Sequence, residues 1–330
     1  MCKTTVIIPN WSGLSDLKEC LKTLKKQTSP FRLVIVDNGS ADGSGEFLKS
    51  QAFQENFPET DVVLLPENTG FCHAVNLGVS KARTKYIFLL NNDTKIRADC
   101  IEKLEKAIEG RKEVFAVQAL MLSADGKKID SAGDSYLPFG YALSRLKGKA
   151  YQPSQKYPSI RKVFSCCAGA ALYRRKCFQT LGGLDEAHFA YLEDVDLGWR
   201  AANRGYGNYL CKEAIVLHKG SASTGSRHNP FKTYHAARNN VYVLYKNMPP
   251  LFAAINLPLI GAGMLVKAAY FAPKGLGKDY IKGIRDGVEG SIGKRAPIYR
   301  TSFQWKRWKQ YLGIQINLYH NIIDIFSVRL

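Results

Sequence analysis

The chain has 330 residues, of which 45% are hydrophobic and 23% charged, values typical of a globular protein with a substantial core. Lys and Arg number 47 against 28 Asp and Glu, and the net charge of +19 favours nucleic acid, anionic lipid or diphosphate-bearing small molecules as partners. The eight cysteines include no CxxC pair, which argues against a disulfide framework and for free thiols in a reducing compartment.

The first 120 residues alternate between short apolar runs and helical patterns. The N-terminus runs straight into the first apolar run without a secretory signal, which favours the cytoplasm. Leucines at helical spacing between Leu14 and Leu24 predict a helix after the first strand. This alternation predicts an α/β fold with a mainly parallel central sheet that helices cover on both faces. The expected strands are Thr4–Ile8, Phe31–Asp37, Val62–Leu65, Tyr86–Leu90 and Val114–Leu120.

The middle of the chain is less regular. Residues 121–162 are polar and interrupted by Gly and Pro, which predicts a variable loop or flap. Apolar patterning resumes at Val163–Tyr173, and a helix is expected at Asp194–Asn203.

Three polar clusters follow predicted strands, namely Asp37–Ser44, Pro66–Phe71 and Asn91–Asp93. Each could be ordinary turn chemistry by itself, because Asn, Asp, Gly and Ser form turns for local reasons. Ligands of a parallel sheet sit at the carboxyl ends of its strands, so three clusters in succession predict one binding crevice. His218 ends the apolar run Ala214–Leu217, a place that suits either a structural histidine or a ligand.

A fourth polar cluster, Tyr191–Arg200, places three carboxylates within four residues. Asp196 can pair with Arg200 across one helical turn, which gives these two residues a structural role. Glu193 and Asp194 are left at the start of the helix, where a carboxylate that faces a cleft makes a good general base.

These clusters belong to a longer ordered set of motifs: Val6–Trp11, Val36–Ser44, Asn68–Phe71 with Asn76 and Gly78, Leu89–Asp93, Gly182–Glu186, Glu193–Arg200, His218 and Arg238-Asn239. In this order they resemble the family 2 glycosyltransferases, and more narrowly the rhamnosyltransferase-like branch of that family. The resemblance covers roughly residues 4–247 and implies a GT-A nucleotide-diphospho-sugar transferase fold over residues 1–247. Its nucleotide-sugar half would be about 1–120 and its acceptor half about 163–247.

The resemblance implies a nucleotide-sugar site for a dTDP- or UDP-linked donor, with dTDP-rhamnose favoured. Asp37 would hydrogen-bond the imide N–H of a uracil or thymine base, and Trp11 would lie near that base. Asn92 is expected at the ribose and Arg238 at the phosphates. The other residues expected in this site are Pro9, Asn10, Asn68, Gly70 and Asn76.

The resemblance also implies a site for Mg²⁺ or Mn²⁺. Asp93 matches the last acidic residue of the DxD-type motif, whose first position is Asn91 here, and His218 would be the second protein ligand. One Asp and one His suit either ion, and the histidine favours Mn²⁺ modestly. The ion would neutralise the leaving diphosphate while Asp194, or its neighbour Glu193, deprotonates the acceptor hydroxyl. A single displacement would invert the anomeric configuration.

Residues 248–330 are first apolar, then basic with interleaved aromatic residues, which predicts a helical region that binds an anionic membrane surface or packs on the catalytic domain. The apolar segment Leu251–Val266 is interrupted by Asn256 and Pro258 and has about 16 residues, fewer than the roughly 20 that span a bilayer. Membrane attachment would make the protein peripheral on the inner face of the cell membrane. The family branch then suggests a polyprenyl-diphosphate-linked saccharide acceptor and a role in cell-surface polysaccharide synthesis.

Four other functions agree less well with the sequence. A nucleotidyltransferase on a related α/β fold would share the metal turn but not the Glu193–Arg200 segment. A basic nucleic-acid-binding protein fits the charge, but no helix-turn-helix, zinc-finger or RRM signature is present, so nucleic acid is not an expected partner. A glycoside hydrolase would need opposed carboxylates, which the adjacent Glu193 and Asp194 supply poorly. A Rossmann oxidoreductase lacks its GxGxxG after the first strand.

Overall fold

A computed structural model describes residues 2–153, 159–220, 229–293 and 300–327. Its main sheet has the strand order β10-β12-β6-β11-β4-β1-β2-β3. One half of this sheet is parallel, and its strands match four of the predicted ones. They are β1 (Thr4–Asn10), β2 (Phe31–Asn38), β3 (Thr60–Leu65) and β4 (Tyr86–Leu90).

The other half of the sheet is mixed. The fifth predicted strand, β6, runs parallel to β12, while β11 lies antiparallel between β4 and β6, and β10 forms an antiparallel edge. Short β5 pairs with β12 so that Thr94 lies opposite His218, which brings the residue after Asp93 beside the end of β12. The bounds are β5 (Thr94–Ile96), β6 (Val114–Ser123), β10 (Ile160–Val163), β11 (Ala170–Arg174) and β12 (Gly207–His218).

The prediction of a loop or flap over residues 121–162 is wrong for much of its described length. This region contains the end of β6, then β7 (Ile129–Ser131), the hairpin of β8 (Asp134–Leu137) and β9 (Tyr141–Ser144), and the start of β10. Strands of three or four residues carry almost no periodicity of their own, and pairing with distant strands forms them here.

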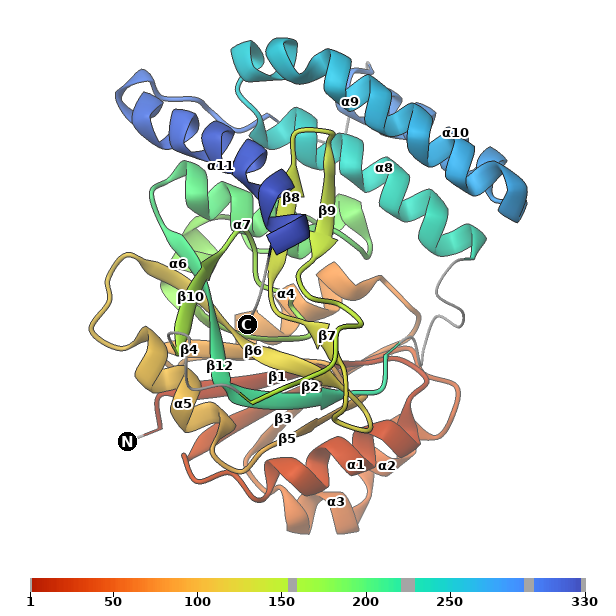
Figure 1. Ribbon diagram of the computed structural model, residues 1–330. Helices are drawn as coiled ribbons and strands as arrows, with labels where there is room; N and C mark the ends of the chain where they lie inside the picture. The colour runs from red at the N-terminus through yellow and green to blue at the C-terminus, as the bar shows by residue number, and fades with distance from the viewer. Residues whose placement is uncertain (1, 154–158, 221–228, 294–299, 328–330) are drawn as a thin grey trace.

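Helices cover both faces of the sheet (Figure 1). Each face has its own core of buried aliphatic side chains, and the predicted α/β fold is confirmed. The first core takes in α1, whose predicted leucines Leu17, Leu21 and Leu24 are buried, and α5. The second takes in α4, α6 and α7. The helices are α1 (Leu14–Leu24), α2 (Ser44–Lys49), α3 (Gln51–Asn56), α4 (Phe71–Lys81), α5 (Cys100–Ile108), α6 (Arg175–Thr180) and α7 (Glu193–Asn203).

A further layer of helices lies beyond α7, at the top of Figure 1. It has a third core, in which Trp199 of α7 and Tyr136 of β8 meet Val243 of α8 and Leu318 of α11. The C-terminal region therefore packs on the catalytic half instead of standing apart from it. Its helices are α8 (Pro230–Asn247), α9 (Pro250–Phe271), α10 (Gly277–Ile292) and α11 (Trp308–Ser327).

Helix α9 runs without a break through Asn256 and Pro258, the two residues that interrupt its apolar sequence. The Asn256 side chain turns inward, where it exchanges hydrogen bonds with Gln315 of α11 at 3.0 Å and accepts one from Tyr319. Among the described residues one helix, Pro250–Lys274, is long and apolar enough to cross a membrane by length and composition, and only 17% of its most apolar window is buried.

Candidate active site

The carboxyl ends of β1, β2 and β4 hold a chain of buried polar side chains. Asn92 Nδ2 donates to Asn10 Oδ1 at 2.6 Å, and Asn10 Nδ2 donates to Asp37 Oδ1 at 2.8 Å. Ser40 donates its hydroxyl to the same Asp37 oxygen at 2.6 Å. These bonds fix the Asp37 carboxylate at the sheet edge, where the half-exposed Trp11 ring follows β1. Three of the residues predicted to bind the nucleotide, Asn10, Asp37 and Asn92, thus form one connected group. Pro9, also predicted there, lies inside β1 next to Asn10.

The loops after β2 and β3 are held together by Asn38, a residue that the sequence did not single out for a role. Its Nδ2 donates to Asn68 Oδ1 at 3.0 Å, and its Oδ1 accepts from the backbone of Thr69 at 2.9 Å. Gly70 has φ of +91°, and a Cβ there would lie 2.6 Å from the Phe189 ring. The predicted Asn68 and Gly70 therefore shape the crevice wall and bring it against the segment before α7.

Asn76 also has a structural task. Its side chain donates to the Leu184 carbonyl at 2.8 Å and accepts from the Leu184 backbone N–H at 3.0 Å. The predicted nucleotide-sugar residue thus anchors the turn after Gly182-Gly183 to α4. The signal for this pairing was the polar position on an otherwise apolar face of α4, which the sequence alone could not connect with Leu184.

The predicted metal ligands meet at the end of β12. His218 Nε2 lies 3.2 Å from Asp93 Oδ1, and His218 Nδ1 lies 2.7 Å from Asp130 Oδ2. Lys147 in turn lies 2.7 Å from Asp130 Oδ1. If a metal ion displaced the Nε2 proton while Nδ1 kept its proton toward Asp130, the Nε2 lone pair would point to the side of Asp93, the arrangement in which a carboxylate orients a metal-binding histidine. Asp130 was missed because it lies in the region predicted as a loop.

The neighbouring opposite charges at this site shift the pKa values of His218 and Asp130 so that the charged form of each is favoured. Burial disfavours the imidazolium of His218, but the hydrogen bonds that it donates to Asp130 and Asp93 outweigh burial and raise the His218 pKa to about 9. Burial likewise opposes ionisation of Asp130, but His218 and Lys147 lower the Asp130 pKa to about 2.

Asp93 and His218 fit a divalent cation as a two-ligand pair. In the described ranges no group of three or more His, Cys, Asp or Glu side chains could hold a metal. Mg²⁺ takes one or two carboxylates and fills its remaining positions with water and substrate phosphate, so a sparse protein ligand set is what a phosphate-bridging ion needs.

We expect Asp130→Asn to weaken Mn²⁺ binding about 10–100-fold, the range found when a second partner of a metal-binding histidine is removed. The amide cannot hold the Nδ1 proton as strongly, so the imidazole loses its fixed orientation. Calorimetric titration of Mn²⁺ into protein with bound UDP measures the effect, with Lys147→Met as a control that keeps the Asp130–His218 bond. Equal Mn²⁺ affinity in Asp130→Asn and the parent would show that this carboxylate does not orient a ligand.

The two candidate bases stand at the start of α7. Asp194 Oδ2 accepts the Ala168 backbone N–H at 3.1 Å, and Oδ1 accepts that of Val195 at 2.8 Å. Glu193 is buried, and its Oε2 has no hydrogen-bond partner among the described residues. Burial raises the pKa of both, but the two N–H groups oppose the rise at Asp194, whereas the charge of Asp194 lifts the pKa of Glu193 well above its usual value. The geometry therefore favours Asp194 as the ionised base.

Asp194 lies close to the metal turn. Its partner Ala168 precedes Gly169, whose carbonyl accepts the backbone N–H of Asn91 at 3.0 Å. A Cβ on Gly169 would stand 3.1 Å from Asn91 Nδ2, a tight contact that would require the Asn91 side chain to shift. The turn Asn91–Asp93 thus connects the Asn10–Asp37–Asn92 group, the Asp93–His218 pair and Asp194.

The segment that leads into α7 has an unusual backbone. Phe189, Tyr191 and Leu192 have φ of +63°, +72° and +65°, a region in which each non-glycine residue costs about 1–3 kcal/mol. Asn239 Nδ2 lies within 2.9 Å of the carbonyls of His188, Ala190 and Tyr191, and Arg238 Nη2 donates to those of Ala187 and His188.

Arg238 therefore holds this backbone, and its contact with phosphate stays a prediction. The adjacent Arg238-Asn239 pair positions Asp194 through the strained segment, a role that sequence reasoning did not foresee.

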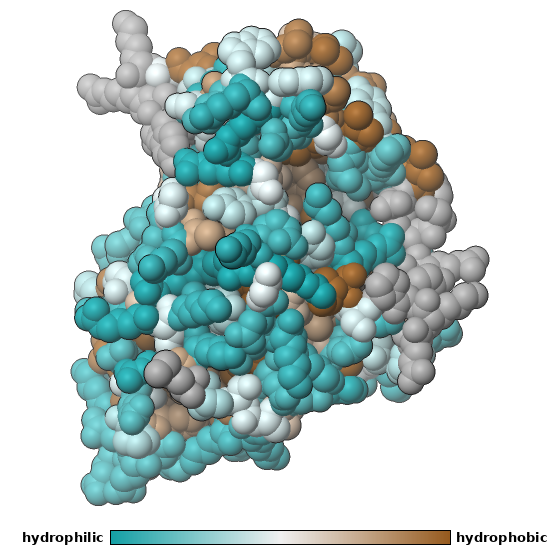
Figure 2. All heavy atoms as spheres, turned by 90° about the vertical axis from the view of Figure 1, so that its left-hand side faces the viewer, coloured by the Kyte–Doolittle hydropathy of each residue, from teal (hydrophilic) through white to brown (hydrophobic). Residues whose placement is uncertain are grey.

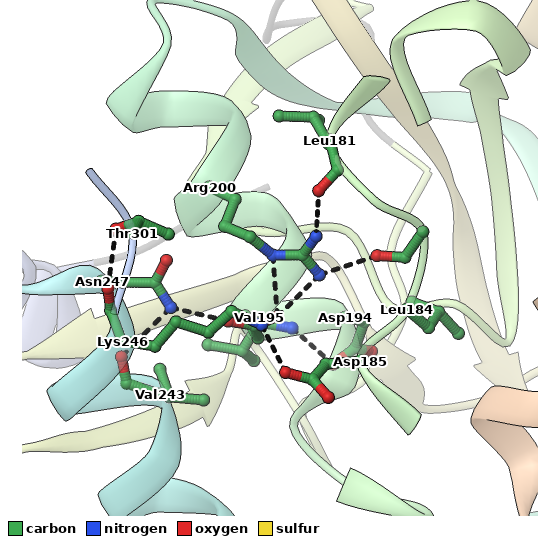
Figure 3. A network of polar contacts seen from close by, with 12 residues as sticks. Leu181, Leu184, Asp185, Asp194, Val195, Arg200, Val243, Lys246, Asn247 and Thr301 are labelled. Carbon is green, nitrogen blue, oxygen red and sulfur yellow. Dashed lines mark hydrogen bonds and ion pairs between the residues drawn. The ribbon is translucent and has the colours of Figure 1, made fainter. Parts of the chain in front are cut away.

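Asp196 joins α7 to a buried polar network, in which Figure 3 shows Arg200, Lys246 and Asn247 pointing toward one another. The predicted pair with Arg200 is confirmed at 2.7 Å, and Lys246 of α8 lies 3.2 Å from the same Asp196 oxygen and 2.6 Å from Asp185. Asn247 donates to the other Asp196 oxygen at 2.7 Å. Burial opposes ionisation, but Arg200 and Lys246 hold the Asp196 pKa well below its usual range.

The chain is similar to several known proteins. A chain from Mycobacterium tuberculosis named N-acetylglucosaminyl-diphospho-decaprenol L-rhamnosyltransferase is 27% identical over 67% of this chain and 77% of its own length. The structure of Staphylococcus aureus TarS residues 1–349 in complex with UDP-GlcNAc superposes with a TM-score of 0.59 at 14% identity, over 96% of this chain and 90% of that one.

GalNAc-T7, solved with UDP, GalNAc and Mn²⁺, also gives a TM-score of 0.59 at 15% identity, over 74% of this chain and 48% of that one. At such identities the structures show the GT-A fold. The family profile described as Glycosyl transferase family 2 matches residues 5–182, more than half of the chain. The chain therefore belongs to glycosyltransferase family 2.

Proposed function

We propose that this glycosyltransferase moves a sugar, rhamnose in the first instance, from a dTDP- or UDP-linked donor to a hydroxyl of a lipid-linked saccharide with inversion at the anomeric carbon. The observation that carries the proposal is that the turn Asn91–Asp93 connects the Asp93–His218 pair, Asp194 and the Asn10–Asp37–Asn92 group. The name of the mycobacterial relative supports the choice of sugar and acceptor.

The donor half of the reaction would use the sheet edge. The buried Asp37 carboxylate can accept the imide N–H of uracil or thymine, and the exposed face of Trp11 can pack on the base. Asp93 and His218 would hold Mg²⁺ or Mn²⁺, which supplies positive charge to the departing diphosphate.

The acceptor half would use α7. Asp194 takes the proton of the attacking hydroxyl, and its two backbone N–H bonds hold the carboxylate still while it does so. Displacement from the face opposite the diphosphate inverts the anomeric carbon and needs no nucleophile on the protein.

The C-terminal helices suit peripheral attachment to a membrane. The outer side of α9 exposes Leu251, Ile255, Leu257, Leu265 and Val266, each by more than half of its surface. Figure 2 shows hydrophobic side chains gathered along the top of the molecule, at the level of these helices, above a mostly hydrophilic lower part. A helix face of this kind binds at the boundary of headgroups and acyl chains. The net charge of +19 would add attraction to anionic lipids.

The proposal is tested by transfer from a panel of donors (dTDP-rhamnose, UDP-glucose, UDP-galactose, UDP-GlcNAc and GDP-mannose) to a synthetic alkyl-diphosphate GlcNAc with Mn²⁺. We expect one donor to give a disaccharide product whose anomeric configuration, read by NMR, is opposite to that of the donor. A product of retained configuration would contradict the single displacement, and a product from GDP-mannose alone would contradict the uracil- or thymine-binding site.

A further inference from the structure

A cavity of about 280 Å³ lies between α8, α9 and α10, beside the segment that leads into α7. One water needs only about 15 Å³, so the cavity has room for a ligand group of several heavy atoms. Its wall includes Tyr191, Lys232, Thr233, Lys267, Phe271 and Tyr280, and no acidic residue lines it. None of the roles described above uses this cavity.

Lys267 is the one charged residue of α9. Its neighbours Leu265 and Val266 are 73% and 64% exposed, whereas Lys267 is half-buried and lines the cavity. Its ammonium lies 4.2 Å from the centre of the Tyr141 ring, and among the described residues no carboxylate pairs with it. Burial lowers the Lys267 pKa to about 8. A lysine held away from water without a counter-charge is an incomplete site for an anion.

Thr233 supplies an independent sign of a missing ligand. Its side chain is 4% exposed and lines the cavity, yet Oγ1 has no hydrogen-bond partner within the described part of the chain. Buried hydroxyl groups are nearly always hydrogen-bonded, so an unmatched one needs an explanation. Lys232 precedes it on α8 and adds a second positive charge to the wall. Two ammonium groups and a hydroxyl donor around one cavity match the oxygens of a phosphate.

The position of the cavity links it to the acceptor. Tyr191 lines it three residues before Asp194, within the strained segment that Asn239 holds. Helix α9, which contributes Lys267 to the cavity wall, also carries the exposed apolar side chains of Leu265 and Val266. A molecule with its phosphate in the cavity would have a saccharide toward Asp194 and an apolar chain along α9.

We propose that the cavity between α8, α9 and α10 binds the phosphate groups of an isoprenoid-diphosphate-linked acceptor, with Lys232, Lys267 and Thr233 as donors. This inference rests on the proposed glycosyl transfer to a lipid-linked acceptor. It gives the diphosphate of that acceptor a binding site of its own, separate from the catalytic residues. The same chemistry could also come from free pyrophosphate or an anionic phospholipid, so the test separates these sources.

The test is calorimetric titration of farnesyl diphosphate into the whole chain, with inorganic pyrophosphate and phosphatidylglycerol vesicles as separate titrants. The variants are Lys267→Met and Thr233→Val, and Lys274→Met is the matched control, because it removes an exposed lysine beyond the end of α9 that does not line the cavity. Thr233→Val keeps the shape of a side chain that makes no hydrogen bond, so its fold should be unharmed. Binding of UDP with Mn²⁺ is measured on every sample as an independent report on the donor site.

We expect farnesyl diphosphate to bind the parent, and its affinity to fall at least about tenfold in Lys267→Met and several-fold in Thr233→Val, as for lost hydrogen bonds to a charged group. Lys274→Met and the binding of UDP should be unchanged, and pyrophosphate should bind more weakly. No binding of farnesyl diphosphate, or equal binding in all variants, would overturn the site even when UDP binds normally. Loss of vesicle binding in Lys267→Met with farnesyl diphosphate unaffected would overturn it in favour of a phospholipid headgroup.

Discussion

Replacing Asp194 with asparagine is expected to lower kcat for sugar transfer about 10²–10⁴-fold, the usual contribution of a general base, while donor binding stays the same. The amide cannot take the acceptor proton. It can still accept one of the two backbone N–H bonds from Ala168 and Val195, so α7 should keep its start. Steady-state transfer kinetics measure kcat, and calorimetry with UDP and Mn²⁺ measures donor binding.

Glu193→Gln is the matched variant, because it changes the adjacent carboxyl in the same way. The Glu193 carboxyl is buried, and burial and the charge of Asp194 raise its pKa well above normal, which disfavours its ionised form. We therefore expect its kcat to fall far less than that of Asp194→Asn. The reverse order of the two variants would assign the base to Glu193 and contradict the account.

Replacing Lys246 with methionine is expected to lower the free energy of unfolding by about 3–5 kcal/mol, the loss found when one partner of a buried ion pair is removed. Lys246 is fully buried, and its ammonium lies between Asp185 and Asp196 (Figure 3). Methionine fills the space but leaves the Asp185 carboxylate with no ion partner in the described structure. Urea unfolding followed by tryptophan fluorescence measures the change, since the buried Trp199 lies on α7 together with Asp196.

Lys103→Met serves as the control, because the Lys103–Asp99 pair is partly exposed and such pairs contribute about 1 kcal/mol or less.

The dependence of stability on acid pH gives a second test of the network around Asp196. The folded pKa of Asp196 lies below its unfolded value of about 3.9, so its stabilisation is present above that pH and is lost as the pH falls further. Equal unfolding free energies for Lys246→Met and the parent would show that the network does not brace α7.

The local sequence pattern was enough to predict the strands in the parallel half of the sheet. Long apolar strands such as Tyr86–Leu90 have distinct ends, and polar residues after them fall at the sheet edge whatever the rest of the chain does. This is why Asp37 and Asn92 could be grouped before their contacts were known, whereas Asn10 was expected there from the family resemblance. The ordered motifs then separated a glycosyltransferase from the nucleotidyltransferase and nucleic-acid-binding alternatives, and the family match agrees.

Residues whose partners lie far away in the chain could not be predicted. Asp130 comes from a short strand without periodicity and reaches His218 only because β7 pairs with β6 beside β12. Lys246 meets Asp196 across a helix pair, and its charge gave no hint of full burial. For Arg238 the motif predicted a contact with phosphate but gave no sign of a structural role. In the structure its guanidinium donates hydrogen bonds to the carbonyls of Ala187 and His188, next to the strained segment.

The proposed function requires that the residues around Asp93 and Asp37 bind a nucleoside diphosphate together with a metal ion. Calorimetric titration of UDP and dTDP, with and without Mn²⁺, tests this requirement directly. We expect at least one of the two nucleotides to bind in the presence of Mn²⁺, and the affinity of that nucleotide to fall tenfold or more without the ion or in Asp93→Ala. Absence of binding by both nucleotides in the presence of Mn²⁺, or binding indifferent to Mn²⁺ and to Asp93, would contradict the proposed function.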